Sequence, residues 1–130
     1  MIAVDTSALM AVVLNETLAN ACAEAMEGEE ELLISAGTVA EALIIAGRRN
    51  LGEEMTRLID GLGFTIVSVT SAAAHRVAQA YERWGKGVHP AGLNFGDCFA
   101  YEVAMEHRCR LLYVGADFDR TDVARVLESE

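Results

Sequence analysis

The sequence predicts an α/β fold in which a mostly parallel central sheet lies between two layers of helices. Short apolar runs alternate along the chain with longer segments of helical periodicity, and such alternation indicates strand–helix–strand units that build a parallel sheet. The chain has 130 residues, of which 52% are hydrophobic, so its length suits one domain with a substantial core. We therefore expect residues 1–130 to form a single three-layer α/β/α sandwich.

Four apolar runs are the expected strands. The run at 64–69 is rich in β-branched residues, which favour strands. The run at 2–4 ends abruptly in the carboxylate of Asp5. A last short element is expected at 123–127, and the position of a fifth strand near the C-terminus is left open. The four strands are expected at residues 2–4, 32–34, 64–69 and 111–114.

Helices are expected between these runs. Leu18, Cys22 and Met26 recur at the spacing of one helix face, which predicts an amphipathic helix. Thr70 or Ser71 has the residue type that caps the start of another helix. The expected helices cover residues 8–14, 18–26, 36–49, 51–62, 71–84 and 94–107.

Four acidic residues are expected to meet at one edge of the sheet. Asp5 ends the first strand, and Asp117 follows the fourth. Glu41 and Asp97 lie in the first turns of two of the helices. In a parallel sheet, the C-terminal ends of the strands and the starts of the following helices share the edge at which such folds bind ligands. The sequence therefore predicts a cluster of carboxylates at that edge.

Each acid also has a structural interpretation when it is taken alone. Asp5 has the residue type of a helix N-cap. Thr38 with Glu41 fits a capping box, and Asn94 with Asp97 fits a cap followed by a helix-start acid. These interpretations weaken when the acids are taken together, because no Lys or Arg lies beside them and apolar residues surround two of them. Unpaired carboxylates in such surroundings are costly, so a cation is the expected partner.

The expected cation is Mg²⁺ or Mn²⁺, because these hard ions prefer oxygen ligands. Such an ion activates water and stabilises in-line attack at phosphorus, so phosphodiester hydrolysis is the leading chemistry. Thr6 and Ser7 follow Asp5 directly, and two roles stay open for them. They either hold a metal-bound water or a phosphate oxygen, or they cap the first helix.

The composition limits the remaining classes of function. A net charge of −10 weighs against tight binding of free RNA or DNA, since nucleic-acid binders carry a basic face. It suits a solvated surface, a basic partner or metal-binding carboxylates. No run reaches the roughly 18 apolar residues of a membrane span, and the N-terminus lacks the pattern of a signal peptide. Three cysteines fit a reducing compartment, so we expect a soluble, cytoplasmic protein with no membrane partner.

Four segments occur along the whole chain in an order that is typical of one known family. They are VDTS at 4–7, residues 38–41, LNFGDC at 93–98 and VGADFDRTD at 114–122. Together they resemble the PIN-domain family, most closely the VapC-type toxin ribonucleases of toxin–antitoxin pairs. The resemblance implies an α/β/α fold and a Mg²⁺- or Mn²⁺-dependent endoribonuclease that cleaves RNA. It also implies a homodimer and inhibition by a cognate VapB-type antitoxin.

The resemblance also assigns the site residues. One departure from the family is visible, because the family often has an acid or amide directly after the glycine of its last motif, where this chain has Ala116. Asp119 is therefore kept as the alternative to the fourth acid, and Asn94, Thr6 and Ser7 are supporting candidates. The catalytic and metal-binding positions of the family map onto Asp5, Glu41, Asp97 and Asp117.

The family resemblance explains the net negative charge, since an antitoxin tail can supply Arg or Lys to the acidic site. Few cations are then left to hold RNA: Arg48, Arg49, Lys86 and Arg120 are the candidates, and the first two suit a helix C-terminus equally well. A homodimer is also expected from the helices at 8–14 and 18–26, which offer more apolar surface than a small sheet covers.

Two other classes of function stay open. One is a Mg²⁺-dependent phosphotransfer domain with Asp5 as the nucleophile, which usually needs a lysine near the phosphoryl group. The only lysine, Lys86, lies in a glycine-rich loop, which counts against this class. The other is a non-catalytic acidic module that binds a basic partner.

Overall fold

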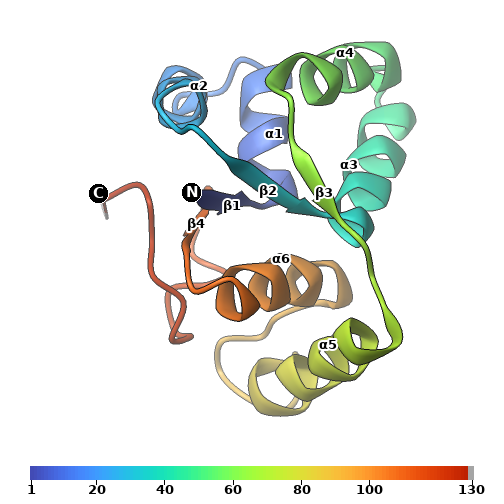
Figure 1. Cartoon of the computed structure of the whole chain (residues 1–130), viewed down its shortest axis with the longest axis vertical. Coiled ribbons are helices and arrows are strands. Elements are labelled where there is room, and N and C mark those ends of the chain that lie inside the picture. Colours follow the sequence, from blue (N-terminus) through green and yellow to red (C-terminus); the bar gives the residue numbers. More distant parts are fainter. Residues whose placement is uncertain (129–130) are drawn as a thin grey trace.

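The computed structural model of the protein describes residues 1–128 and has the predicted architecture, a parallel sheet between two layers of helices (Figure 1). The last two residues of the predicted domain, 129–130, lie outside this part. The strands are β1 (Ile2–Val4), β2 (Leu32–Ser35), β3 (Thr65–Val67) and β4 (Arg110–Leu112). The helices are α1 (Thr6–Val13), α2 (Ala19–Glu27), α3 (Ala36–Arg48), α4 (Gly52–Leu62), α5 (Ser71–Trp84) and α6 (Phe95–Glu106).

All neighbouring strands run parallel, in the order β3-β2-β1-β4. The first strand of the sequence is therefore central, with Ala3 opposite Leu33 of β2 and Leu111 of β4. The backbone N–H of Asp5 donates to the carbonyl of Leu112 at 3.0 Å, so the residue after β1 lies beside the end of β4. This pairing brings the two strand ends that carry predicted acids to the same edge of the sheet.

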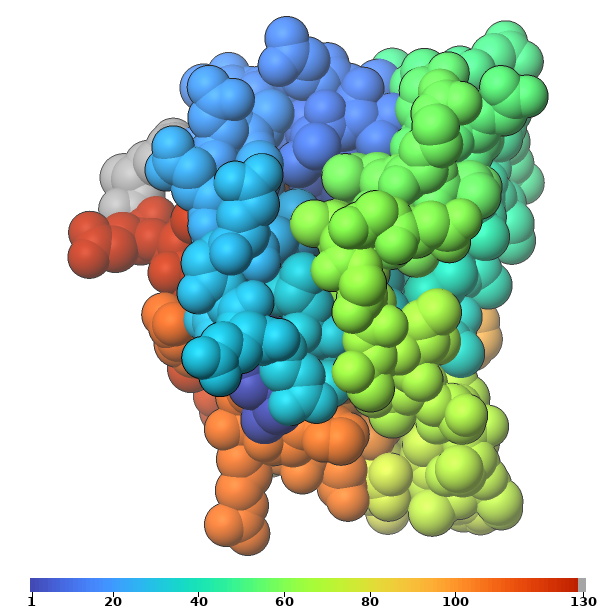
Figure 2. Space-filling model, turned by 45° about the horizontal axis from the view of Figure 1, so that its top comes forward, coloured from blue at the N-terminus to red at the C-terminus, as the bar shows by residue number. Residues whose placement is uncertain are grey.

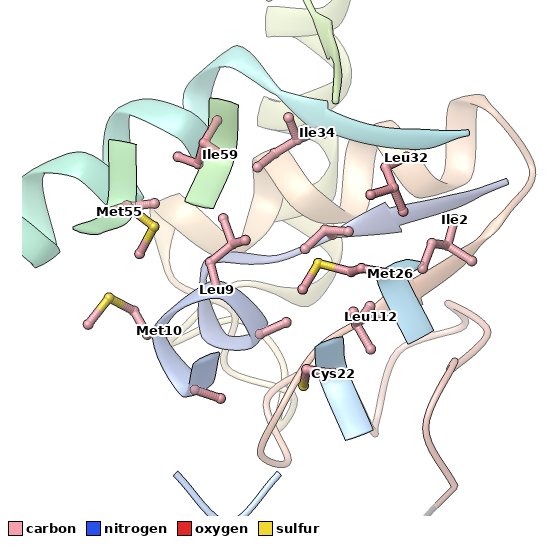
Figure 3. Close-up of a cluster of buried hydrophobic side chains, with 14 of the residues drawn as sticks. Ile2, Leu9, Met10, Cys22, Met26, Leu32, Ile34, Met55, Ile59 and Leu112 are labelled. Atoms are coloured by element: carbon pink, nitrogen blue, oxygen red, sulfur yellow. The ribbon is translucent and has the colours of Figure 1, made fainter. Parts of the chain in front are cut away.

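Successive residues of the strands point into two separate cores, one on each face of the sheet. Ile2 and Val4 of β1 pack with side chains from α1, α2, α3 and α4 (Figure 3). Ala3, between them, packs with α5 and α6 on the opposite face. The two central strands, β1 and β2, are thus buried on both faces, as is usual when helices cover both sides of a parallel sheet. This explains why the strands appear in the sequence as continuous apolar runs without polar alternation.

Polar side chains cap the first turns of several helices, including α1 and α5. The helix predicted at 8–14 begins earlier, at Thr6, because the Asp5 carboxylate accepts a hydrogen bond from the backbone N–H of Ser7 at 3.1 Å. The structural interpretation of Asp5 as an N-cap is therefore confirmed. Thr70 caps α5, since its hydroxyl accepts from the N–H of Ala73 at 3.1 Å.

The alternative interpretation of Thr38 with Glu41 as a capping box is wrong. The helix begins at Ala36, and Ser35 caps it by accepting from the backbone N–H of Gly37 at 3.1 Å. Thr38 and Glu41 both lie inside the helix, and Thr38 is fully buried. Glu41 therefore has no role in capping, and its carboxylate is available to the acidic edge of the sheet.

The segment after β4 returns to the sheet through a single bridge. The N–H of Leu111 donates to the carbonyl of Ala124 at 2.8 Å, and the N–H of Val126 donates to the carbonyl of Leu111 at 3.1 Å. These bonds place Arg125 parallel to Leu111 on the outer side of β4. The open question of a fifth strand is thus answered by one bridged residue, in the segment that lies beside β4 in Figure 1.

The apolar surface expected on α1 is covered within the chain. Leu9 and Met10 are buried in the core between α1 and its neighbouring helices, so the reason first given for a homodimer is wrong. The large exposed apolar side chains lie elsewhere: Ile44 on α3 is 58% exposed, and Phe95 at the start of α6 is 71% exposed. Ile66 on β3 is also exposed. Figure 2 shows the light green segment of the chain on the surface of the molecule. Among residues 1–128, no helix combines the length and the apolar character that spanning a bilayer requires.

Candidate functional site

The structure brings the four predicted acids to the edge of the sheet at which β1 and β4 end. Asp5 follows β1 and Asp97 lies in the first turn of α6, and these side chains are only 4% and 7% exposed. Glu41 reaches the edge from α3 and is partly buried, whereas Asp117 lies exposed in the loop after β4. Asp97 lies within electrostatic range of the other three carboxylates. Four segments that are distant in the sequence thus contribute one acid each.

Asp5 is held by the helix that it caps. Its Oδ2 accepts hydrogen bonds from the backbone N–H of Ser7 at 3.1 Å and from the Ser7 hydroxyl at 2.7 Å. Its Oδ1 is buried and has no hydrogen-bond partner among the described residues. Burial raises the pKa of Asp5 to about 6; the hydrogen bonds from Ser7 oppose this rise, and the charge of Glu41 adds to it. A buried carboxylate oxygen without a partner is costly, so Oδ1 is a candidate ligand atom.

Asp97 forms the predicted cap with Asn94. The N–H of Asn94 donates to Asp97 Oδ2 at 3.0 Å, and the N–H of Asp97 donates to Asn94 Oδ1 at 2.8 Å, which completes a capping box. Burial nevertheless raises the pKa of Asp97 to about 7 against the lowering effect of the Asn94 bond. The charges of Asp5, Asp117 and Glu41 add to the rise. Because a helix start favours an ionised acid, this rise means that burial and like charges outweigh the cap.

Glu41 is fixed between α1 and α6. The Thr6 hydroxyl donates to Glu41 Oε1 at 2.5 Å. The carboxylate also lies directly against Gly96, where even a methyl group would overlap it. Gly96 is therefore a site residue that the sequence analysis did not single out. A glycine in the first turn of a helix was the available signal, since it lowers helix stability and calls for another reason.

Thr6 and Ser7, whose roles stayed open, both hold carboxylates in this structure. Thr6 bonds to Glu41, and Ser7 donates to Asp5. The Ser7 hydroxyl also accepts from the backbone N–H of Val114 at 3.0 Å. This side chain therefore links the start of α1 to the segment that leaves β4, and it fixes the spacing of two parts of the acidic edge.

Asp117 and Asp119 differ in what surrounds them. Asp119 Oδ1 accepts from the Tyr113 hydroxyl at 2.8 Å and forms an ion pair with Arg125 Nη1 at 2.7 Å. The carboxylate of Asp117 has no hydrogen bond or ion pair within residues 1–128, and its charge acts on Asp97. The geometry therefore favours Asp117 over Asp119 as the fourth acid.

The four carboxylates suit a hard divalent cation by their chemistry. No salt bridge within residues 1–128 involves any of them, although the buried Oδ1 of Asp5 needs a partner. In the conformation described, no three His, Cys, Asp or Glu side chains of this part are arranged closely enough to hold a metal ion. Like charges repel, and the bonds from Thr6, Ser7 and Asn94 hold the acids in separate positions. A bound Mg²⁺ or Mn²⁺ would offset this repulsion and draw the oxygens together.

The cations expected to hold RNA are dispersed over the surface. Arg48 and Arg49 lie at the C-terminal end of α3, and Lys86 and Arg120 lie in loops. All four are exposed, and none forms an ion pair within the described part of the chain. They remain candidates for phosphate contacts, but they do not form one basic surface.

The sequence of the whole fold matches one known family. The profile of the PIN domain matches residues 2–124. Ribonuclease VapC28 of Mycobacterium tuberculosis is 36% identical to this chain over 129 residues, which cover 96% of this chain and 97% of the relative. Ribonuclease VapC36 of the same organism is 41% identical over 124 residues, with 92% and 89% covered. The chain therefore belongs to the PIN-domain family, and its relatives in that family are VapC ribonucleases.

Solved structures share the fold at much lower identity. VapC20 of M. tuberculosis, a toxin described as cleaving the sarcin–ricin loop, aligns with a TM-score of 0.79 at 15% identity and covers 97% of this chain and 98% of its own. VapBC2 of Rickettsia felis, solved with a promoter DNA fragment, aligns with a TM-score of 0.72 at 12% identity over the whole of both chains. Likeness at these identities confirms the α/β/α fold and carries no further conclusion.

The raised pKa values of the two buried acids predict a pH-dependent stability of the metal-free protein. In an unfolded chain the pKa of an Asp carboxyl is roughly 4, whereas in the folded protein the pKa is about 6 for Asp5 and about 7 for Asp97. Between these limits the folded state binds more protons than the unfolded state. The free energy of unfolding should therefore fall as the pH rises through this window.

Asp97→Asn should remove the part of this dependence that arises from Asp97, because the amide keeps the size and the capping oxygen but not the charge. With EDTA at about pH 8, the variant should be more stable than wild type by ~1 kcal/mol, and it should gain less from Mg²⁺. Thermal melting across the window measures both effects. Asp60→Asn, which removes an exposed acid of α4, is the matched control. A lower melting temperature of Asp97→Asn in EDTA would mean that Asp97 is structural.

Proposed function

We propose that the protein is a metal-dependent endoribonuclease and the toxin of a VapBC-type toxin–antitoxin pair. The observation that carries the proposal is the meeting of Asp5 and Asp97, two buried acids with raised pKa values, with Glu41 and Asp117 at one edge of the sheet. No side-chain cation of the described residues neutralises them. The names of the relatives at 36% and 41% identity, which are ribonucleases, support RNA as the substrate class.

In this proposal the chain supplies a set of oxygen ligands at one edge of the sheet, which a bound ion would draw together. Mg²⁺ or Mn²⁺ bound there would activate a water and stabilise negative charge at phosphorus. Asp5, Asp97 and Glu41 bind the ion from three rigid elements, and Asp117 completes the set from the loop after β4. Thr6 and Ser7 act as positioning residues, since each donates a hydrogen bond to a ligand carboxylate.

The partner that we propose is a VapB-type antitoxin. Solved relatives of the fold include a toxin–antitoxin complex from Klebsiella pneumoniae, aligned with a TM-score of 0.70 at 19% identity over 94% of this chain and 93% of its own. The net charge of −10 favours a basic partner, and an Arg or Lys of such a partner would compete with the metal ion for the four carboxylates. We place the protein in the cytoplasm, where both RNA and an antitoxin would be available.

The competing classes receive less support from the site. Asp5 as an attacking nucleophile would need a nearby cation for the phosphoryl group, but Lys86 is exposed in the loop between α5 and α6. A non-catalytic acidic module would account for the charge. It would not account for the burial of two of the acids away from a partner's side chains.

The proposal predicts RNA cleavage that depends on a divalent ion. EDTA should abolish it, Mg²⁺ or Mn²⁺ should restore it, and Asp5→Asn should lower the rate by at least about a hundredfold, because a ligand of the ion is lost. Gel analysis of a structured RNA, together with circular dichroism of each variant, is the measurement, and Asp60→Asn is the control. Cleavage that persists in chelator would contradict the proposal. A trapped phospho-aspartate on Asp5 would instead support phosphotransfer.

Gly96→Ala should separate the site from the fold. The added methyl group overlaps the Glu41 carboxylate, the mobile end of a side chain, so the site should be displaced while the fold adapts. Alanine in a helix is also more favourable than glycine by up to ~1 kcal/mol. The variant should therefore melt at or above the wild-type temperature and yet cleave RNA at least about tenfold more slowly, as a displaced catalytic group implies. Wild-type cleavage by this variant would remove Glu41 from the proposed site.

We also propose a homodimer, through a different surface from the one first considered. Phe95 lines two cavities beside α6, one of about 400 Å³ with Ile44 and Gly37 and one of about 540 Å³ with Val69 and Tyr81. A protruding aromatic ring beside apolar cavities suits a self-complementary contact between two copies, in which each Phe95 fills a cavity of the other.

Light scattering at micromolar concentration should therefore give the mass of two chains for the wild type. Ile44→Lys places a charge on this surface and should shift the mass toward one chain. Val88→Lys is the matched control, because Val88 is equally exposed, at 58%, and lines neither cavity. A wild type with the mass of one chain would count against the dimer, and equal effects of both variants would count against this surface.

A further inference from the structure

Arg125 lies in the segment that returns to β4, and its side chain contacts Asp119 and Tyr113. Its Nη1 lies 2.7 Å from Asp119 Oδ1, and its guanidinium lies over the ring of Tyr113, 4.8 Å from the centroid. The Tyr113 hydroxyl donates to the same oxygen of Asp119 at 2.8 Å. The backbone of Arg125 is itself fixed, because its neighbours on both sides bond to Leu111 of β4. Asp119 is therefore held by two donors that are both anchored to the sheet.

These contacts restrain the loop that carries Asp117. Phe118, the next residue, is 1% exposed and its ring packs against Tyr113 at 5.0 Å between centroids. The backbone N–H of Asp119 donates to the carbonyl of Ala116 at 3.1 Å, which closes a turn around Asp117. The turn is thus fixed by a buried ring and by a bonded carboxylate, and Asp117, which precedes both, remains exposed and within electrostatic range of Asp97.

The placement of Arg125 also has a cost. Its side chain is 21% exposed, and its Nε is buried with no hydrogen-bond partner among the described residues. A buried donor without a partner destabilises a fold, so an apolar residue here would serve stability better. This cost is explained if the role of Arg125 is to hold Asp119 in place rather than to stabilise the fold.

We propose that Arg125 is a positioning residue: through Asp119, it holds Asp117 toward the other acids. The inference rests on the proposed function, since it assigns Asp117 as the loop-borne ligand of the same metal site. Residues that orient ligands in this way usually affect metal affinity strongly, although they never touch the ion. Arg125 takes no part in the reaction itself.

A purely electrostatic role for Arg125 would have the opposite consequence. Arg125→Met removes a positive charge and should then tighten the binding of a divalent cation, whereas Asp119→Asn removes a negative charge and should weaken it. A positioning role predicts that both substitutions weaken binding, because each breaks the same ion pair. The two single variants together therefore separate the two explanations by sign.

The experiment uses the full chain and measures Mn²⁺ affinity by calorimetry, with RNA cleavage against Mn²⁺ concentration as a second readout. Arg125→Met and Asp119→Asn should each weaken Mn²⁺ binding about tenfold, the lower end of the range for residues that orient ligands. The double variant should be no weaker than either single variant, because all three lose one shared contact. Cleavage at saturating Mn²⁺ should stay near the wild-type rate. Arg57→Met, which removes an exposed cation of α4 paired with Glu53 and Glu54, should bind Mn²⁺ as wild type does.

Unchanged or tighter Mn²⁺ binding by Arg125→Met would overturn the inference, as would additive losses in the double variant. If Arg125→Met does not fold, Arg125→Gln takes its place, because it removes the same charge but keeps a polar side chain: unchanged or tighter Mn²⁺ binding by it would overturn the inference, as would a wild-type affinity of Asp119→Asn. A wild type that neither binds Mn²⁺ nor cleaves RNA would overturn the proposed function and this inference with it. If the wild type binds Mn²⁺ and cleaves RNA, and the variants bind Mn²⁺ as tightly as the wild type, only the inference about Arg125 would be overturned.

Discussion

Repulsion among carboxylates at the end of the sheet is the constraint that the surrounding structure has to accommodate. Parallel strands bring Asp5 and the loop after β4 to one edge, and α6 adds Asp97 in its first turn. Burial and like charge raise the pKa of both buried acids, so each needs donors that keep it in place. Ser7 and Asn94 provide them, and each also belongs to the start of a helix. The residues at the starts of these two helices thus also hold the charges, Ser7 through its hydroxyl and backbone N–H and Asn94 through its backbone N–H.

This double use explains why so much of the architecture could be predicted. Strands buried on both faces leave continuous apolar runs, and Ile2 and Ala3 are both apolar because they face opposite cores. The capping residues mark the helix starts, so the acids next to them could be placed at the edge of the sheet. The residue at which a helix starts was harder to predict, because several neighbouring residues can have the type and spacing of a cap. Thr38 with Glu41 has the spacing of a capping box, but Ser35, at which β2 ends, is the residue that caps α3.

The parts of the site that were missed depend on contacts between distant segments. Gly96 is small because Glu41 of α3 occupies the space beside it; a glycine at a helix start indicates that some reason exists, but nothing local identifies Glu41 as that reason. The apolar residues at 8–14 predicted an apolar helix, but they could not show that other helices of the chain cover Leu9. By its residue type Arg125 looks like any surface arginine, and only the bridge to Leu111 places it where it can contact Asp119. Tertiary proximity, rather than residue type, carries this information.

The position of β1 at the centre of the sheet has a consequence for a chain that is still being synthesised. β1 is made well before one of its two neighbours, β4, which is formed by residues 110–112. Pairing between segments so distant in sequence is slow to form, because a long loop must close before the contact stabilises anything. Until then β1 has an open edge, and Asp5 lacks both the strand beside it and the loop that carries Asp117. A growing chain therefore leaves one edge of β1 unpaired until β4 has been made, and its acidic edge becomes complete only after the loop that carries Asp117 has followed.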